Sequence, residues 1–191
     1  MSPVPALLDA LDGPGLDGHT TNLVAVDADG NACVLTSSLG LGTGDFLPGL
    51  DVQLNSMLGE VDLLREPLRP GSRMASMMAP TLAIGDERVE LAIGSAGGTR
   101  LRTALVGVAA GILDEGLPVA DAIVRPRFHR AGDLVNAEPG VDEDALAELE
   151  ARGLTVRRWA APHHYFGGVS AVTRSGAAGD PRRSGHAASP A

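Results

Sequence analysis

The chain contains no lysine, a single cysteine and very few aromatic residues. All 15 basic residues among its 191 residues are arginines, and 24 acidic residues give a formal net charge of −9. The absence of lysine excludes Schiff-base catalysis and a Walker-type phosphate loop, because both need an ε-amino group. The single cysteine, Cys33, excludes an internal disulfide and a multi-cysteine zinc site. With one Trp, one Tyr and an acidic balance, the chain is not expected to bind nucleic acid.

Positive charge is also missing from the first third of the chain. Residues 1–64 hold nine acidic residues and no arginine, so the start of the chain lacks the basic segment of a signal peptide. The longest apolar run, residues 104–113, has the size of a buried helix and is too short to span a bilayer. The sequence therefore predicts a soluble chain and leaves its localisation open. Its length suits one domain with a sizeable core.

Turn residues and hydrophobic periodicity predict an α+β fold. One hairpin is expected over residues 23–38, with Gly30 or Asn31 at positive φ in its turn, and another over residues 81–93. The later elements are expected to be helices at 99–115, 119–124 and 143–152 and strands at 154–159 and 169–174. Hairpins followed by helices and further strands favour α+β over a parallel doubly wound sheet.

Three regions are predicted along the chain. Residues 1–19 have the acidic, Gly- and Pro-rich composition of a flexible lead-in. Residues 20–174 are expected to form the folded domain, and residues 175–191 a frayed tail.

Two threonines, Thr20 and Thr21, stand directly before the first expected strand. Read alone, such a pair reflects the β-propensity of threonine. A threonine hydroxyl becomes an effective nucleophile only beside a base, and its own α-amino group can serve if the chain is cut before it. The ordinary pKa of that amine, about 7.7–8.0, leaves a useful neutral fraction at physiological pH.

A glycine-rich segment, residues 94–100, separates an expected strand from an expected helix. The adjacent Gly97 and Gly98 allow backbone N–H groups to approach a substrate closely, and the following helix N-terminus favours negative charge. The segment can therefore hold an oxyanion or a phosphate, or it can be a plain tight turn.

The remaining polar clusters have weaker patterns. His129, His163 and His164 lack the spacing of a metal site. Three arginines near Pro126 can clamp an anion or pair with nearby acids, and pairing is the simpler interpretation. They are Arg125, Arg127 and Arg130.

Taken in order, these segments resemble the small subunit of gamma-glutamyltransferases, and the resemblance covers about residues 19–183. The blocks that carry it are Thr20-Thr21, Asp29-Gly30-Asn31, Thr36-Ser37-Ser38, Gly42-Thr43-Gly44, Met78-Ala79-Pro80-Thr81, residues 94–100, Pro126-Arg127-Phe128-His129 and Gly179-Asp180-Pro181-Arg182. The resemblance implies the αββα sandwich of N-terminal nucleophile hydrolases. This chain would hold the small-subunit half, and the large subunit, missing from it, would be its partner in a heterodimer.

For catalysis, the resemblance implies cleavage between His19 and Thr20, which makes Thr20 both nucleophile and base. Ser38 stands where the family has a second threonine that hydrogen-bonds the nucleophile. Gly97 and Gly98 match the pair whose N–H groups form the oxyanion hole. A γ-glutamyl amide would acylate Thr20, and water or an amine would resolve the acyl-enzyme. Neither a cofactor nor a metal is implied.

The residues implied for the amino-acid head group depart from the family pattern. Gly40 replaces an Asn, Met57 a Gln, and Ser76-Met77 a Ser-Ser pair, whereas Glu60 keeps the carboxylate of an Asp. Glu60 and Ser76 are therefore the expected substrate-binding residues. Each lost polar contact to a charged head group typically costs ~1.5–3 kcal/mol.

Two alternatives to a glutathione-type γ-glutamyl amidohydrolase follow from these departures. The chain can belong to an acylase of the same family that acts on another amide. It can also be a catalytically inert small-subunit fragment.

Overall fold

The computed structural model describes residues 20–59, 63–64 and 66–189, which divide into two units. The first unit contains Thr20 and the segment from Ser38 to Ala75, and the second contains Thr21–Ser37 and the chain from Ser76 onward. Within the first unit the elements are short: β3 (Phe46–Leu47), β4 (Val52–Gln53) and the 3-10 turn η1 (Met57–Gly59). Backbone hydrogen bonds link them, such as the one that the Leu54 amide donates to the Asp45 carbonyl (3.0 Å).

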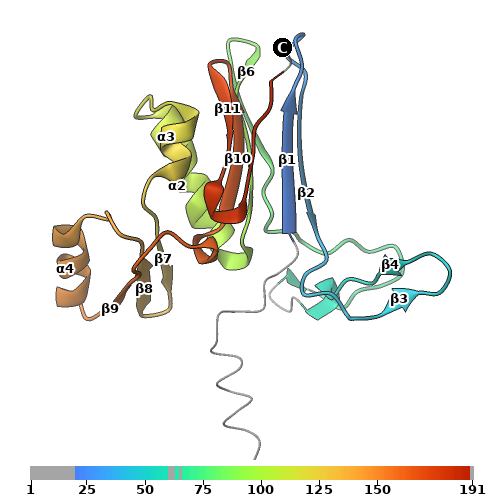
Figure 1. Cartoon of the computed structure of the whole chain (residues 1–191). Coiled ribbons are helices and arrows are strands. Elements are labelled where there is room, and N and C mark those ends of the chain that lie inside the picture. The colour runs from blue at the N-terminus through green and yellow to red at the C-terminus, as the bar shows by residue number, and fades with distance from the viewer. Residues whose placement is uncertain (1–19, 60–62, 65, 190–191) are drawn as a thin grey trace, which may run out of the picture. The chain divides into compact units, whose positions relative to one another are not determined.

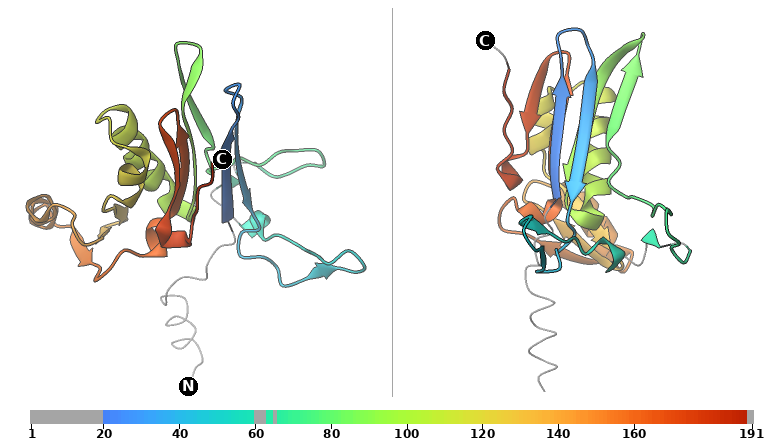
Figure 2. Two further views of the ribbon diagram at one scale, coloured as in Figure 1. Left: turned by 45° about the horizontal axis from the view of Figure 1, so that its top comes forward. Right: turned by 90° about the vertical axis from the view of Figure 1, so that its right-hand side faces the viewer.

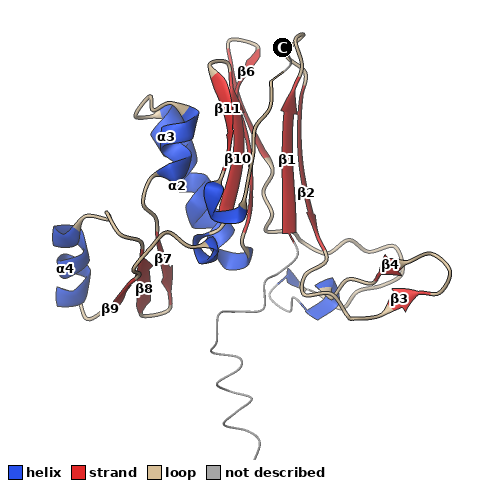
Figure 3. Cartoon of the chain, viewed as in Figure 1, coloured by secondary structure: helices blue, strands red, loops and turns tan. Residues whose placement is uncertain are grey.

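The second unit is built on a four-stranded antiparallel sheet with the order β11-β10-β6-β5 (Figures 1 and 3). The strands are β5 (Thr81–Gly85), β6 (Arg88–Ala96), β10 (Gly168–Thr173) and β11 (Gly176–Gly179). Gly168 lies opposite Ala96, so β10 begins where β6 ends.

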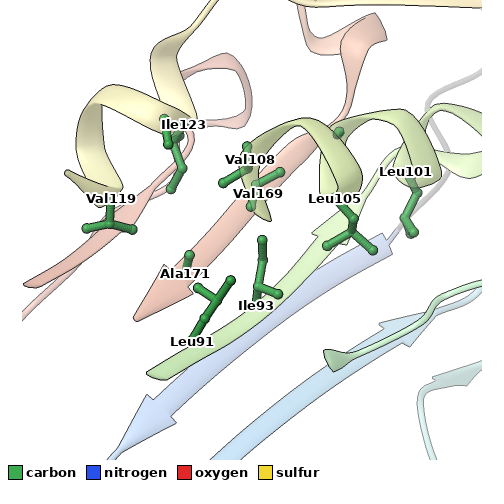
Figure 4. Packing of buried hydrophobic residues seen from close by; sticks show 11 residues of the cluster. Leu91, Ile93, Leu101, Leu105, Val108, Val119, Ile123, Val169 and Ala171 are labelled. Atoms are coloured by element: carbon green, nitrogen blue, oxygen red, sulfur yellow. The ribbon is translucent and has the colours of Figure 1, made fainter. Parts of the chain in front are cut away.

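Helices α2 (Leu101–Leu113) and α3 (Val119–Val124) cover one face of this sheet (Figure 1). In α2, Leu101, Leu105 and Val108 recur at three- and four-residue intervals, so they share the buried face of the helix. Figure 4 shows them above the sheet residues Leu91 and Ile93, with which they form the main core.

A hairpin of β1 (Thr20–Val26) and β2 (Ala32–Ser38) forms a separate two-stranded sheet. The second unit's part of this hairpin lies on the side of the β11-β10-β6-β5 sheet opposite the helices (Figure 2). The approach is close at Gly94, where a Cβ would lie 2.0 Å from the Asn22 amide nitrogen. In the hairpin turn Gly30 has φ +88°, as predicted.

A smaller three-stranded sheet joins β7 (Phe128–Ala131), β8 (Leu134–Ala137) and β9 (Thr155–Arg158). β8 pairs antiparallel with β7 and parallel with β9. The crossover contains α4 (Glu143–Ala151), which begins at the predicted cap, since the Asp142 carboxylate accepts hydrogen bonds from the amides of Asp144 and Ala145.

The α+β fold and the predicted hairpins and helices are confirmed, with helix boundaries shifted by one or two residues. The β7–β8 hairpin was not among the predicted elements. The tail also differs from the expectation of fraying over residues 175–191. β11 and the 3-10 turn η5 (Pro181–Arg183) occupy part of it, because the buried Asp180 accepts hydrogen bonds from the amides of Val169 and Arg182. Among the described residues, no helix is long and apolar enough to cross a membrane.

The buried face of α2 supplies a test of this packing. Leu105→Ala removes a side chain that is 8% exposed and leaves a cavity, so it should lower the free energy of unfolding by about 2–5 kcal/mol. Val106→Ala, at the neighbouring position where the side chain is 65% exposed, is the matched control and should change it little. Urea unfolding of both variants measures the difference, and equal losses would contradict the assigned helix face.

Candidate active site

Thr20 and Ser38 meet at the open end of the β1–β2 hairpin. Thr20 is the first residue of β1 and Ser38 the last residue of β2, and their hydroxyl oxygens lie 3.0 Å apart. Both side chains are half-buried. The amide of Gly40 also donates to Ser38 Oγ (3.0 Å), which fixes the serine beside the threonine hydroxyl.

The loop after Ser38 is closed over Gly40 by Ser56 and Met57. Gly40 has φ +64°, and a Cβ there would lie 2.6 Å from Ser56 Oγ and 3.5 Å from Met57 Sδ. Ser56 Oγ accepts from the amide of Leu41 (2.8 Å), and the amide of Ser56 donates to the carbonyl of Leu39 (2.9 Å). A side chain at position 40 would therefore have to displace the Ser56 hydroxyl, and the glycine avoids this clash.

Gly97 and Gly98 form a bend between β6 and α2, which we call the diglycine bend. Their φ angles, +144° and +56°, lie in the region that favours glycine. Gly98 opens the 3-10 turn η3 (Gly98–Arg100), which runs directly into α2. Backbone N–H groups at the start of this helical segment carry partial positive charge, so the bend can bind an anion or a developing oxyanion.

Of the two expected substrate-binding residues, Ser76 and Glu60, the structure describes only Ser76. Ser76 belongs to the second unit, where its Oγ accepts a hydrogen bond from the amide of Met78 (3.2 Å). Glu60 lies outside the described residues, as does His19, which precedes the expected cleavage point.

A buried network of two arginines and two acids is the main feature that was not predicted from the sequence. Arg127 Nη2 lies 2.6 Å from Asp180 Oδ2, and Arg182 Nη2 lies 2.6 Å from Glu138 Oε2. Pairing with acids was the simpler interpretation of the arginines near Pro126, and the ion pairs of Arg125, Arg127 and Arg130 confirm it. The Gly179–Arg182 block was the available signal for the partner Asp180, but the sequence does not show which side chains it contacts.

His129 is buried beside the start of α2. Its Nδ1 lies 2.8 Å from Thr103 Oγ1. Burial lowers the pKa of His129, and the nearby charges of Arg100 and Arg102 lower it further. Within the part of the chain that the structure describes, no group of three or more His, Cys, Asp or Glu residues could hold a metal ion.

The chain is similar to known proteins in both sequence and structure. The gamma-glutamyltranspeptidase family model matches residues 9–189. The glutathione hydrolase proenzyme of Escherichia coli is 32% identical over 160 residues, which cover 75% of this chain and 28% of that protein. The acylase ACY 1 proenzyme of Pseudomonas sp. strain V22 is 26% identical over 171 residues, covering 83% of this chain and 29% of the relative.

Among solved structures, the gamma-glutamyltranspeptidase of Pseudomonas nitroreducens in complex with L-DON is 26% identical, with a TM-score of 0.72. The match covers 90% of this chain and 98% of that one.

These matches define an enzyme fold of the N-terminal nucleophile hydrolase class, in which the first residue of a processed chain is the nucleophile. The chain belongs to the gamma-glutamyltranspeptidase family. It spans less than a third of the length of the two curated relatives above, at 28% and 29%.

The pKa of His129 predicts how stability changes with pH. The folded protein keeps this histidine neutral to a lower pH than the unfolded chain, whose histidines titrate near about 6.5. As the pH falls through that value, the unfolded state binds the proton first, so stability falls until the pH passes below the folded pKa. Urea unfolding at about pH 8 and about pH 5.5 should therefore show a smaller loss of stability in His129→Asn than in the unsubstituted protein.

The exposed His186 supplies the control for this experiment. His186→Asn should retain the full loss of stability between the two pH values. An equal effect of the two substitutions would contradict the assignment to His129.

Proposed function

We propose that the chain is the catalytic small-subunit part of an amidohydrolase or acyltransferase of the gamma-glutamyltranspeptidase family, with Thr20 as the nucleophile. The observation that carries the proposal is the Thr20–Ser38 contact, at 3.0 Å, at the start of the first strand. Cleavage before Thr20 would free an α-amino group on the nucleophile itself. That amine would accept the hydroxyl proton as Oγ1 attacks the amide carbonyl.

Ser38 and the diglycine bend have distinct roles in this reaction. Ser38 Oγ, held by the Gly40 amide, orients the Thr20 hydroxyl. The backbone N–H groups of Gly97 and Gly98 would donate to the oxygen of the tetrahedral intermediate. The intermediate then expels the amine, which takes a proton from the Thr20 ammonium group, and leaves an ester on Thr20. Water or a second amine attacks this ester and regenerates the enzyme.

A large subunit is the partner that the proposal requires. Members of this family are processed heterodimers of a large and a small subunit. The outward positions of the hairpin include Leu23 and Leu35, which are 55% and 57% exposed. Apolar side chains at these positions support a face that a partner chain covers.

Replacing the nucleophile tests the proposal directly. In the protein assembled with its large subunit, Thr20→Ala should leave the bond after His19 uncut and lower turnover of an amide substrate by at least ~10³-fold. Intact-mass spectrometry and a chromogenic amide assay measure the two effects.

The matched control is Thr21→Ala, which removes a neighbouring threonine whose side chain is exposed. It should leave both cleavage and turnover close to those of the unsubstituted protein. Turnover that survives in Thr20→Ala would rule out Thr20 as the nucleophile.

A second candidate function is acylase activity on an amide without an amino-acid head group. Ser56 and Met57 are the nearest side chains to Gly40, in the loop beside Thr20 and Ser38. Neither side chain carries a charge or an amide group. The family's asparagine and glutamine, as the resemblance implies them, are therefore both absent. The similarity to the acylase ACY 1 proenzyme supports this candidate.

A γ-glutamyl anilide and a glutaryl anilide, two chromogenic substrates that differ only in the α-amino group, separate the candidates. Without contacts to this amino group, the glutaryl anilide should be hydrolysed with a kcat/KM at least equal to that of the γ-glutamyl anilide. A retained contact to the amino group would instead favour the γ-glutamyl compound by about 10-fold or more. A preference of that size would exclude the acylase and leave the γ-glutamyl enzyme.

A further inference from the structure

The diglycine bend is in close backbone contact with Gly167, the residue just before β10. A Cβ on Gly97 would lie 2.7 Å from Gly167 Cα, and a Cβ on Gly167 would lie 2.9 Å from the Ala96 carbonyl oxygen. Gly167 itself has φ +79°. No side chain fits between the two backbones, so a shift of Gly167 is transmitted directly to Gly97.

Arg127 holds the backbone on the far side of this contact. Its Nη1 donates to the carbonyls of Phe166 (3.3 Å) and Gly167 (3.2 Å), and its Nη2 donates to the carbonyl of Ile123 (2.9 Å). The pairing with Asp180 orients the guanidinium, and Asp180 Oδ2 also accepts from the amide of Val169 (3.1 Å). The Arg127–Asp180 pair therefore fixes the backbone through the carbonyls of residues 166 and 167 on one side and the amide of Val169 on the other.

Glu138 and Arg182 complete the network. Glu138 Oε2 accepts a hydrogen bond from the amide of Arg127 (2.9 Å), and Arg182 donates to both carboxylate oxygens of Glu138 (2.7 and 2.6 Å). Arg182 Nη1 also lies 3.3 Å from Asp180 Oδ1. All four side chains are at most 8% exposed.

Such burial is expensive for the fold. Desolvation opposes each buried charge, and a well-packed apolar cluster of the same volume is often as stable or more so. Stability alone is therefore a weak reason for this network, whereas its hydrogen bonds to the backbone at residues 166–169 have a consequence for the bend.

We propose that Arg127, oriented by Asp180, is a positioning residue that sets the diglycine bend through Gly167. The inference rests on the proposed function, in which the Gly97 and Gly98 amides bind the oxyanion. A lysine at position 127 keeps the charge but lacks the planar fork that reaches three carbonyls at once. Arg127→Lys should therefore misplace the bend while retaining the ion pair with Asp180.

The test compares Arg127→Lys with Arg158→Lys in the assembled protein. Arg158 also donates to carboxylates, those of Glu143 and Glu150, but its contacts lie on α4 and β9. The readouts are kcat and KM per active site, titrated with an electrophile that labels the nucleophile, and amide hydrogen exchange of the peptide covering residues 94–100.

Arg127→Lys should lower kcat per titrated site about 10- to 100-fold with little change in KM, because oxyanion donors act in the transition state. Exchange of residues 94–100 should become faster. Arg158→Lys should change neither. Asp180→Asn, which keeps an oxygen acceptor for the Val169 amide, should give the same pattern and serves if Arg127→Lys does not fold.

If both variants, Arg127→Lys and Asp180→Asn, kept the kcat per titrated active site and the amide exchange of the unsubstituted protein, the positioning role would be overturned. The role would also be overturned if the variants gave less folded protein but the folded fraction turned over substrate at the normal rate. If the unsubstituted assembly hydrolyses no amide, the proposed function fails separately, and the exchange of residues 94–100 still decides whether Arg127 sets the bend.

Discussion

The contact between Gly97 and Gly167 constrains the chain where β6 ends and β10 begins. On one side the antiparallel register, with Gly168 opposite Ala96, fixes the strands. On the other side the core under α2 fixes the helix into which the bend leads. Glycine is required at both contact positions because each has a positive φ and a backbone neighbour within 3 Å of the missing Cβ. The direction of the Gly97 and Gly98 amides is therefore a product of sheet register and helix packing together.

Arginine at positions 127 and 182 suits this architecture for geometric reasons. The Arg127 guanidinium donates to three carbonyl groups and one carboxylate, and Arg182 also serves both acids of the network and backbone carbonyls. An ammonium group has three donors around a single nitrogen and cannot span such a set. Burial lowers the pKa of Arg127, while Asp180 opposes the shift, so the guanidinium stays charged although it is buried.

Local patterns were sufficient to predict much of the fold. The spacing of Leu101, Leu105 and Val108 indicated α2, and Asp142 marked the start of α4. β11 has the sequence Gly-Ala-Ala-Gly, which has low β-propensity and forms a strand only by pairing with β10. The β7–β8 hairpin was missed for a related reason, since a four-residue strand with His129 and Arg130 shows too little alternation.

The contacts of the candidate site also divide into those within one hairpin and those between segments far apart in the sequence. Thr20 and Ser38 are 18 residues apart, and their hydroxyls meet because β1 of the hairpin predicted over residues 23–38 begins three residues earlier, at Thr20. Gly97 and Gly167 meet only through the pairing of β6 with β10. Arg127, just before β7, pairs with Asp180, just after β11, across 53 residues of sequence. Sequence spacing carries no signal for such long-range contacts, although the residue types at each position were visible.

The residues proposed for catalysis and those implied for substrate selection are held differently, and this difference accounts for the larger departures from the family pattern among the latter. Thr20, Ser38 and the diglycine bend stand at strand ends, where a substitution disturbs a sheet as well as the site. Gly40 lies in the loop after β2 and Met57 begins the 3-10 turn η1, and local hydrogen bonds hold this region, such as that from the Ser56 amide to the Leu39 carbonyl. Changing them alters the surface beside Thr20 and Ser38 without disturbing a sheet. A lineage can therefore change its amide substrate while keeping the same acyl-transfer chemistry.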